Sequence, residues 1–448
     1  MSAVNVIGAG LAGCEAAWQI AKRGAKVRLF EMKPLKFSPA HKDQNFAELV
    51  CSNSFKGENL ENAAGLLKKE LEIGGSLILE AAQKNRVPAG GALAVDRDGF
   101  AEYVTQKIRS HENIEVICGE VTKIDRSQPN IIATGPLTSE NFLDEIKDII
   151  GEDCLHFFDA AAPIIDVSSI DFTQAFYGSR YGKGEKDYIN CPLTKEQYAI
   201  FYQELIAAET AKLHEFDRKY IEKNVFEGCM PVEIAAKRGE AALLFGCMKP
   251  VGLIDEKTGK RPYAALQLRQ DNSGATMYNM VGFQTNLKFS EQKRVFSLIP
   301  ALKDCEFLRY GTMHQNTFIN SPKLLDGTYN LKKERNIYFA GQITGVEGYM
   351  CSTSSGFVAG IAAAQKILNL ENLALFPRFT AIGALAHYIS DESVEKFWPM
   401  GINFGIIEPP NEKKEKIKGG KIAIRQEIAK IALEYLKSWK YLQESQKI

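Results

Sequence analysis

The sequence predicts an α/β fold into which a second domain of α+β type is inserted. The chain opens with a short apolar strand, a glycine-rich turn and a helix, and a buried strand with a second glycine turn returns near residue 340. Between these parts, residues 165–300 are rich in Tyr, Phe, Gly and Lys and alternate less clearly between strand and helix. A chain of 448 residues is long enough for two to four domains.

The first elements predict a βαβ unit. Residues 4–7 form a short apolar run, and residues 8–13 follow it as a glycine-rich turn. Residues 14–23 have the composition of a helix that Gly24 ends, and residues 26–31 predict a second strand. A parallel pair joined by a helix in this way is the start of a Rossmann-like domain.

Later elements follow from the same periodicities. Apolar residues at spacings of three and four predict helix over 57–87, and residues 114–124 predict strands with a turn at Gly119. Residues 130–134 and 336–340 predict two more buried strands. A helix from about 357 to 370 then predicts a return of the chain to the first domain.

The tail of the chain predicts an amphipathic helix. It is basic and places its larger apolar residues on one helical face, and these are Ile424, Ile428, Ile431, Tyr435, Trp439 and Leu442. We expect this face to dock on the core, the alternative being a surface that contacts RNA. The expected domains are therefore 1–160 with 301–372, an insert over 161–300, and a C-terminal helical segment over 373–448.

The composition is that of an ordinary globular protein, with 45% hydrophobic and 25% charged residues. Lys plus Arg and Asp plus Glu both number 55, so a protein that coats nucleic acid by bulk charge is disfavoured and any RNA site is a local patch. Nine cysteines without a Cys-x-x-Cys pair disfavour a zinc ribbon and a disulfide framework, and free thiols suit the cytoplasm. We expect no metal site, no signal peptide and no transmembrane helix.

A dinucleotide site is predicted at the first turn. Gly8, Gly10 and Gly13 have the Gly-x-Gly-x-x-Gly spacing between a strand and a helix, which permits a tight turn and a close approach of backbone to a pyrophosphate. Glu31 ends the second strand, where a carboxylate accepts hydrogen bonds from a ribose. The helix N-terminus adds unpaired N–H groups for the phosphates.

Later fragments favour FAD over NAD. Residues 337–342 are a strand that enters a glycine turn, Gly345 follows closely, and residues 133–135 are a third fragment typical of two-dinucleotide flavoproteins. There is no second Gly-x-Gly-x-x-Gly for a nicotinamide, so NADPH or NADH would bind transiently. The predicted cofactor-binding residues are Gly8, Ala9, Gly10, Leu11, Ala12, Gly13, Glu31, Gly135, Gly341, Gln342 and Gly345.

Several distinct motifs carry a family resemblance. They are residues 47–54 (AELVCSNS), 226–233 (FEGCMPVE), 267–270 (QLRQ), 281–285 (VGFQT), 309–314 (RYGTMH) and 399–405 (PMGINFG). Together they resemble the folate- and FAD-dependent tRNA (uracil-5-)-methyltransferase family, from residue 4 to about residue 440. The resemblance implies that methylenetetrahydrofolate and FADH2 form 5-methyluridine in the T loop of tRNA.

The chemistry of uracil methylation requires a reactive thiol. Uracil C5 becomes nucleophilic when a thiolate adds to C6, and Cys229, in a Gly-Cys-Met-Pro break, is the predicted nucleophile. Glu227 and Glu233 flank it, and either is a candidate for proton transfer. By resemblance, Cys51 lies beside the flavin and His314 covers the pterin of the folate.

A predicted loop over residues 176–184 interleaves aromatic and basic residues, and Arg180, Tyr181 and Lys183 are its candidates for RNA contact. The alternative is a glycine-rich surface loop without RNA. For the whole chain, three alternatives stay open: the same chemistry on ribosomal RNA, a flavin-binding RNA chaperone without catalysis, and a general NADPH–flavin oxidoreductase. No DNA or membrane partner is expected.

Overall fold

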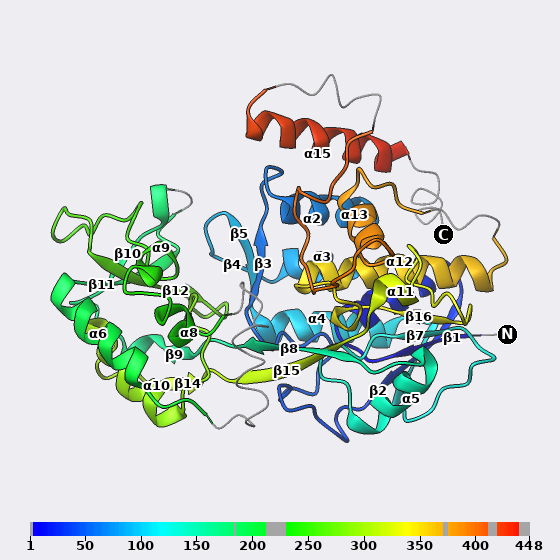
Figure 1. Cartoon of the computed structure of the whole chain (residues 1–448), viewed down its shortest axis with the longest axis horizontal. Helices are drawn as coiled ribbons and strands as arrows, with labels where there is room; N and C mark the ends of the chain where they lie inside the picture. Colours follow the sequence, from blue (N-terminus) through cyan, green and yellow to red (C-terminus); the bar gives the residue numbers. More distant parts are fainter. Residues whose placement is uncertain (1–2, 183–184, 212–229, 371–374, 411–418, 439–448) are drawn as a thin grey trace.

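The computed structural model describes residues 3–182, 185–211, 230–370, 375–410 and 419–438. Its centre is a parallel sheet of five strands in the order β16-β7-β1-β2-β6 (Figure 1). These strands are β1 (Ala3–Ile7), β2 (Lys26–Glu31), β6 (Ile114–Cys118), β7 (Asn130–Ile132) and β16 (Ile337–Phe339). β1 pairs with β2 on one side and with β7 on the other, so the turns after these strands meet at one edge of the sheet.

Two helices pack closely on this sheet. α1 (Leu11–Ala21) follows β1, and α12 (Tyr349–Ile367) lies directly against α1. A Cβ at Gly356 would lie 2.1 Å from the carbonyl oxygen of Ala12, so only glycine permits this approach. α12 begins at Tyr349, earlier than the predicted start near residue 357, because buried small residues continue the helix toward its N-terminus.

The predicted helix over 57–87 is divided. α2 (Ala63–Ile73) ends at Gly74, Gly75 has a φ of +68°, and the Ser76 side chain caps α3 (Leu77–Lys84). The predicted strand after Gly119 was wrong, because β6 ends at Cys118 and the chain after it forms no strand. The remaining helices of this part are α4 (Arg97–Ser110), α5 (Glu140–Ile150), α11 (Ser321–Leu324) and α13 (Ala381–Tyr388).

A second, antiparallel sheet of six strands has the order β10-β11-β12-β13-β9-β14. Its strands are β9 (Ile164–Asp166), β10 (Phe176–Tyr177), β11 (Tyr188–Leu193), β12 (Ala264–Gln270), β13 (Met277–Met280) and β14 (Phe307–Arg309). α6 (Lys195–Ala207) and α10 (Phe289–Phe296) bury Phe201 and Phe296 in a hydrophobic cluster with β11 and β12, beside the short helices α8 (Val232–Ala236) and α9 (Ala242–Phe245). This arrangement confirms the α/β fold with an α+β insert; the domain boundaries stay predictions.

Two small sheets complete the fold. β8 (Leu155–Ala160) pairs with β15 (Met313–Phe318), and Figure 1 shows this ribbon between the two larger sheets. β3 (Ser54–Gly57), β5 (Ala92–Val95) and β4 (Arg86–Val87) form the other. The ribbon brings residues of β15 toward the edge where the parallel strands end.

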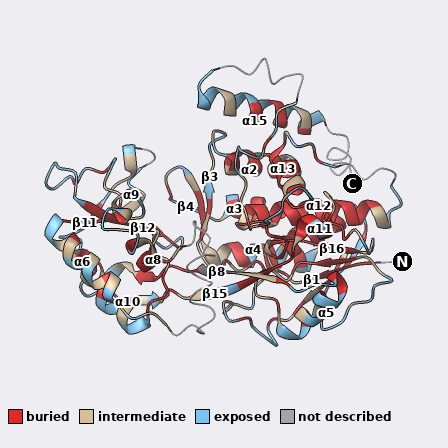
Figure 2. Ribbon diagram, in the orientation of Figure 1, coloured by how far each residue is buried: buried red, intermediate tan, exposed pale blue. Residues whose placement is uncertain are grey.

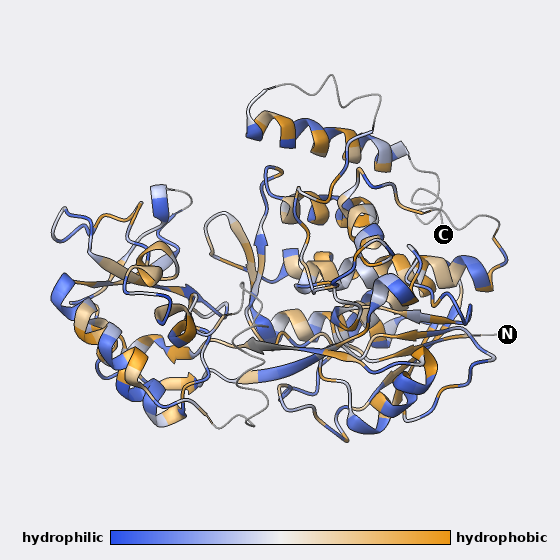
Figure 3. Ribbon diagram, in the orientation of Figure 1, coloured by the Kyte–Doolittle hydropathy of each residue, from blue (hydrophilic) through white to orange (hydrophobic). Residues whose placement is uncertain are grey.

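The core is concentrated around the parallel sheet and α12, where Figure 2 shows nearly continuous burial and Figure 3 many apolar residues. α15 (Lys421–Ser438) packs on α2 and buries Ile428, Ile431 and Leu436 while Lys430 stays exposed. Trp439 and Leu442 of the predicted apolar face lie outside the described residues. Within the part of the chain that the structure describes, no helix has the length and apolar character needed to cross a membrane.

Candidate active site

The three glycines of the first turn have different structural reasons. Gly8 has a φ of +97°, and a Cβ there would lie 2.6 Å from the carbonyl oxygen of Ala133. A Cβ at Gly13 would lie 1.8 Å from the carbonyl oxygen of Gly8, so Gly13 permits the helix to pack on the turn. A Cβ at Gly10 would meet nothing within 4 Å and would project into open space. Gly10 therefore leaves room for a ligand at the N-terminus of α1.

A cavity opens beside this turn and is lined by Gly8, Ala9, Gly10, Leu11, Ala12, Glu31, Gly135, Gly341 and Gln342, among other residues. Glu31 is 8% exposed; one carboxylate oxygen accepts a hydrogen bond from the N–H of Ala9 at 2.8 Å and the other from the N–H of Lys33 at 3.0 Å. These bonds hold the carboxylate at the end of β2, the position expected for a ribose partner. Gly13 and Gly345 lie outside this lining, and Gly345 packs against the ring of Phe397.

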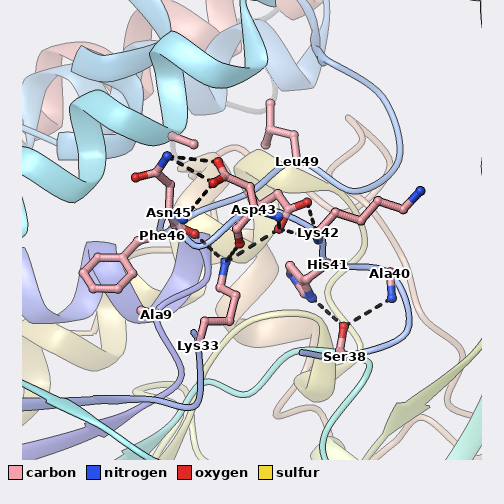
Figure 4. A network of polar contacts seen from close by, with 12 residues as sticks. Ala9, Lys33, Ser38, Ala40, His41, Lys42, Asp43, Asn45, Phe46 and Leu49 are labelled. Atoms are coloured by element: carbon pink, nitrogen blue, oxygen red, sulfur yellow. Dashed lines mark hydrogen bonds and ion pairs between the residues drawn. The ribbon is translucent and has the colours of Figure 1, made fainter. Parts of the chain in front are cut away.

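A buried lysine that sequence reasoning missed organises the next wall (Figure 4). Lys33 is 4% exposed, and its ammonium donates to the carbonyl oxygens of Asp43, at 3.0 Å, and Asn45 and lies 3.6 Å from a carboxylate oxygen of Glu48. These contacts fix the loop that leads from β2 to Cys51. Nothing in the local sequence marks Lys33, because its partners become neighbours only when this loop folds back.

His41 lines the same cavity, and its Nδ1 lies 2.5 Å from the hydroxyl oxygen of Ser38 (Figure 4). Burial, together with the nearby charge of Lys33, lowers the pKa of His41 to about 4. The imidazole is therefore neutral at pH 7 and can donate one hydrogen bond and accept another.

A second cavity continues from the first, and both are lined by Val50, Pro136, Leu137, Gln342, Tyr349 and Ser352. Cys51 lies on its wall; the Cys51 N–H donates to the hydroxyl of Tyr349 at 3.0 Å, and the sulfur lies 3.9 Å from the carbonyl oxygen of Ala160. Tyr349 is the first residue of α12, and burial raises its pKa well above the usual range, so the phenol stays protonated.

Three arginines hold the loop that carries Cys51. Arg97 donates to the carbonyl oxygens of Leu49 and, at 3.0 Å, of Cys51, and Arg309 donates to the carbonyl oxygen of Val50. The third is Arg269, in β12, which donates to the side chains of Ser52 and Asn53 directly after Cys51.

One of these guanidinium groups comes from a helix and two come from the antiparallel sheet. Arg97 begins α4, whereas Arg269 and Arg309 lie on β12 and β14 of the antiparallel sheet. Asp271 pairs with Arg97 at 2.7 Å. The loop is therefore a joint between the two parts of the fold, in a region where positive charge exceeds the negative charge paired with it.

His314, on β15, lies on the wall of the same cavity as Cys51. Its Nε2 is 3.2 Å from the hydroxyl of Thr312, and burial, with a further contribution from Arg309, lowers its pKa. The structure thus brings together Cys51, His314 and the dinucleotide turn, which are far apart in the sequence.

The remaining predicted residues have different outcomes. Cys229, Glu227 and Lys183 are outside the described residues. Arg180 donates to Gln267 Oε1 at 2.7 Å and to the carbonyl oxygens of Lys249 and Val251, so most of its guanidinium holds protein groups.

Tyr181, next to Arg180, is 61% exposed and lines a surface cleft of the antiparallel part. Its backbone has a left-handed φ of +60°, which is uncommon for a residue other than glycine. The ring lies against Gly252, and contact of Tyr181 with RNA stays a prediction.

Comparisons with known proteins agree with this geometry. The family described as "Glucose inhibited division protein A" matches residues 3–371. A protein of Acetivibrio thermocellus named methylenetetrahydrofolate--tRNA-(uracil-5-)-methyltransferase TrmFO is 60% identical over 97% of this chain and 99% of its own length. Proteins of the same name from Lactobacillus gasseri and Listeria monocytogenes are 54% and 56% identical, covering 98% and 93% of this chain and 98% and 94% of their own lengths.

Among solved structures, Aquifex aeolicus GidA in one crystal form matches 99% of this chain and 78% of its own, with a TM-score of 0.68 at 17% identity. A second crystal form gives a TM-score of 0.67 at 16% identity, over 99% and 75% of the two chains. At these identities the likeness concerns the fold alone.

Proposed function

The chain belongs to the glucose-inhibited division protein A family and, within it, to the TrmFO methyltransferases, and on this basis we propose that it forms 5-methyluridine in tRNA from methylenetetrahydrofolate and FADH2. The observation that carries the proposal is the 60% identity with the Acetivibrio thermocellus protein over 97% of this chain. The cavity that joins a dinucleotide turn to Cys51 and His314 supports it. The T loop is the proposed part of the tRNA.

The residues around the first turn fit FAD. Gly10 leaves open space at the N-terminus of α1, and the carboxylate of Glu31 is fixed at the end of the neighbouring strand. The first cavity would hold the adenosine and diphosphate, and the second, beyond Gln342 and Tyr349, would hold the flavin ring. Bound FAD supplies the reducing equivalents that convert the transferred methylene to methyl, and NADPH or NADH is the proposed reductant.

We assign the attack on uracil C6 to Cys229. Its thiolate forms the S–C6 bond as the C5=C6 π bond opens, and negative charge moves to the uracil O4. C5 then attacks the methylene carbon, whose bond to the folate nitrogen breaks, and loss of the C5 proton expels the thiolate. The described residues that follow Cys229 support this role, because the Val232 N–H donates to the carbonyl oxygen of Gln284 at 2.7 Å. Glu233 accepts hydrogen bonds from the hydroxyl of Thr285 and the N–H of Asn286, both at 2.8 Å. Since Gln284 lines the second cavity, this segment is anchored at the cavity wall.

Glu233 was one of two candidates for proton transfer. Glu233 is 2% exposed and its carboxylate already accepts two hydrogen bonds. We therefore assign it the role of anchoring α8 and not that of transferring a proton. Glu227 remains the proposed proton carrier. Cys51 and His314 are proposed to contact the flavin and the pterin, respectively.

The test supplies labelled methylenetetrahydrofolate, NADPH, an unmodified tRNA and a large-subunit rRNA fragment, followed by digestion and detection of labelled 5-methyluridine. We expect label in the tRNA, its loss in Cys229→Ala and its retention in Cys118→Ala, since Cys118 is exposed at the end of β6. Label in the rRNA alone would change the substrate. No label in either RNA, with reducible flavin bound, would refute the proposal.

A further inference from the structure

One wall of the second cavity carries polar side chains that have no protein partner. Asn316 is 3% exposed and lines the cavity, yet its amide forms no hydrogen bond with any group of the described residues. The side-chain amide of Gln284, on the same cavity, is also without a hydrogen bond within the described part of the chain. Both side chains line the cavity, so their amide N–H and C=O groups are available to a molecule that enters it.

A charged group completes this wall. Arg269 is 8% exposed; its Nε donates to Asn53 Oδ1 at 3.0 Å and its Nη2 to Ser52 Oγ at 2.7 Å. Its Nη1 forms no hydrogen bond among the described residues, although the side chain lines the cavity. The first two bonds hold the guanidinium in one orientation, so the remaining donors have a fixed direction.

The residues of this wall come from separate segments of the chain that the fold brings together. Asn316 and His314 are two residues apart on β15 and therefore point to the same side of the strand. Arg269 comes from β12 and Gln284 from the segment after β13, so two sheets contribute. The neighbouring residue on β15, Gln315, is exposed and points the other way.

The chemistry of the wall selects a class of ligand. Each amide offers both an N–H donor and a carbonyl acceptor, and the guanidinium offers donors only. A phosphate or carboxylate would match the arginine but would face the amide oxygens as a like charge. A ring edge that has an N–H beside a C=O matches all three groups, and the pyrimidinone rings of uracil and of a pterin both have that edge.

We propose that Asn316, Gln284 and Arg269 recognise the N–H and C=O edge of a pyrimidinone ring, and that Arg269 stabilises the negative charge that develops on the carbonyl oxygen O4 when that ring is uracil. The inference rests on the proposed function, because addition of a thiolate to C6 of uracil places charge on O4. A buried guanidinium held in one orientation by two hydrogen bonds is well suited to that charge. Uracil and the pterin of the folate are two sources of the same edge.

The experiment compares the wild-type holoenzyme with Asn316→Ala, Asn316→Asp and Gln284→Ala, and Gln315→Ala is the matched control from the opposite side of β15. Equilibrium dialysis with labelled 5-formyltetrahydrofolate measures folate affinity. Steady-state kinetics with tRNA carrying uracil or cytosine at the target position measures kcat/KM. Flavin content and circular dichroism identify a variant that has not folded, in which case Gln284→Ala, at a half-buried site, replaces Asn316→Ala.

If the wall binds uracil, Asn316→Ala and Gln284→Ala lower kcat/KM for tRNA by about 10- to 100-fold and leave folate affinity unchanged. Asn316→Asp then lowers the ratio of kcat/KM for uracil-containing tRNA to kcat/KM for cytosine-containing tRNA. A carboxylate accepts a hydrogen bond from the cytosine amino group and repels O4 of uracil. If the wall binds the pterin, folate affinity falls by a similar factor and the ratio does not change.

Variants that stay within threefold of Gln315→Ala in both measurements would overturn the inference. A wild-type enzyme that makes no 5-methyluridine would instead remove the proposed function. Equilibrium dialysis would then be the one remaining test of whether the wall binds a pyrimidinone edge. Unchanged folate affinity in Asn316→Ala would count against that binding.

Discussion

Gly10 and Gly13 provide a paired test of where the cofactor binds. A Cβ at Gly13 would lie 1.8 Å from the backbone oxygen of Gly8, whereas a Cβ at Gly10 would meet nothing within 4 Å. Gly10 has an ordinary φ of −74°, so alanine there requires no change of backbone. The structure therefore predicts that Gly13→Ala damages folding and that Gly10→Ala damages ligand binding.

The magnitudes follow from these contacts. Backbone displacement at Gly13 should cost about 1–3 kcal/mol or more, the range for overpacking. Gly10→Ala replaces an N-cap glycine, which should cost the apoprotein about 1 kcal/mol or less. If the new methyl group weakens FAD binding about 100-fold, FAD at 100 times the wild-type Kd would stabilise the variant by about 0.4 kcal/mol instead of about 2.7 kcal/mol.

The assay is thermal unfolding of each apoprotein with and without added FAD, together with fluorescence titration of FAD. For Gly10→Ala we expect an apoprotein Tm close to wild type and a much smaller shift with FAD. For Gly13→Ala we expect a lowered apoprotein Tm. Wild-type FAD affinity in Gly10→Ala would refute the placement of the diphosphate at this turn.

Three further predictions concern other parts of the fold. His41 has a pKa of about 4 in the folded chain against an ordinary value of 6.5, so its contribution to stability is fully present above pH 6.5 and is lost as pH falls toward 4. Between pH 6.5 and pH 4, the free energy of unfolding, measured by chemical denaturation, should fall by about 3 kcal/mol more in wild type than in His41→Gln. Parallel pH profiles of the two proteins would contradict the assignment. Gly356→Ala should lower the Tm by several degrees because its Cβ would lie 2.1 Å from Ala12 O, while Gly420→Ala, in open space, should not; equal melting curves would disprove the close packing of α1 on α12. Arg97→Lys should lower turnover at least tenfold with flavin content unchanged, because one ammonium cannot replace a guanidinium that binds Asp271, Leu49 and Cys51 together. Unaltered turnover would mean that the Cys51 loop keeps its position without the guanidinium of Arg97.

Local features of the fold could be predicted because their causes are local. β1, the glycine turn, α1 and β2 depend on residues that are neighbours in the chain, and the structure places all of them as elements close to the predicted bounds. Boundaries set by packing were less accurate. The start of α12 at Tyr349 depends on small residues buried against α1. The division of the 57–87 segment has a local cause, the left-handed Gly75 and the Ser76 cap, which apolar periodicity alone does not reveal.

The residue types in the candidate site carried part of the information. Glycine spacing and the acidic end of β2 mark a dinucleotide turn wherever they occur together, and motifs around Cys51 and His314 were recognisable by resemblance. Arg180 shows the limit of this reasoning, because an arginine in a Gly- and Tyr-rich loop has the composition of an RNA contact, yet in the structure its guanidinium holds three protein acceptors.

The sequence by itself determined the fold class, the cofactor turn and the family. Only the tertiary structure decided which polar groups surround Cys51 and which remain without partners. The three arginines acquire their roles from groups far away in the chain, and a hydrogen bond requires those groups to approach within about 3 Å. That distance is fixed by the packing of α4 and the antiparallel sheet against one loop, and no periodicity along the chain encodes it.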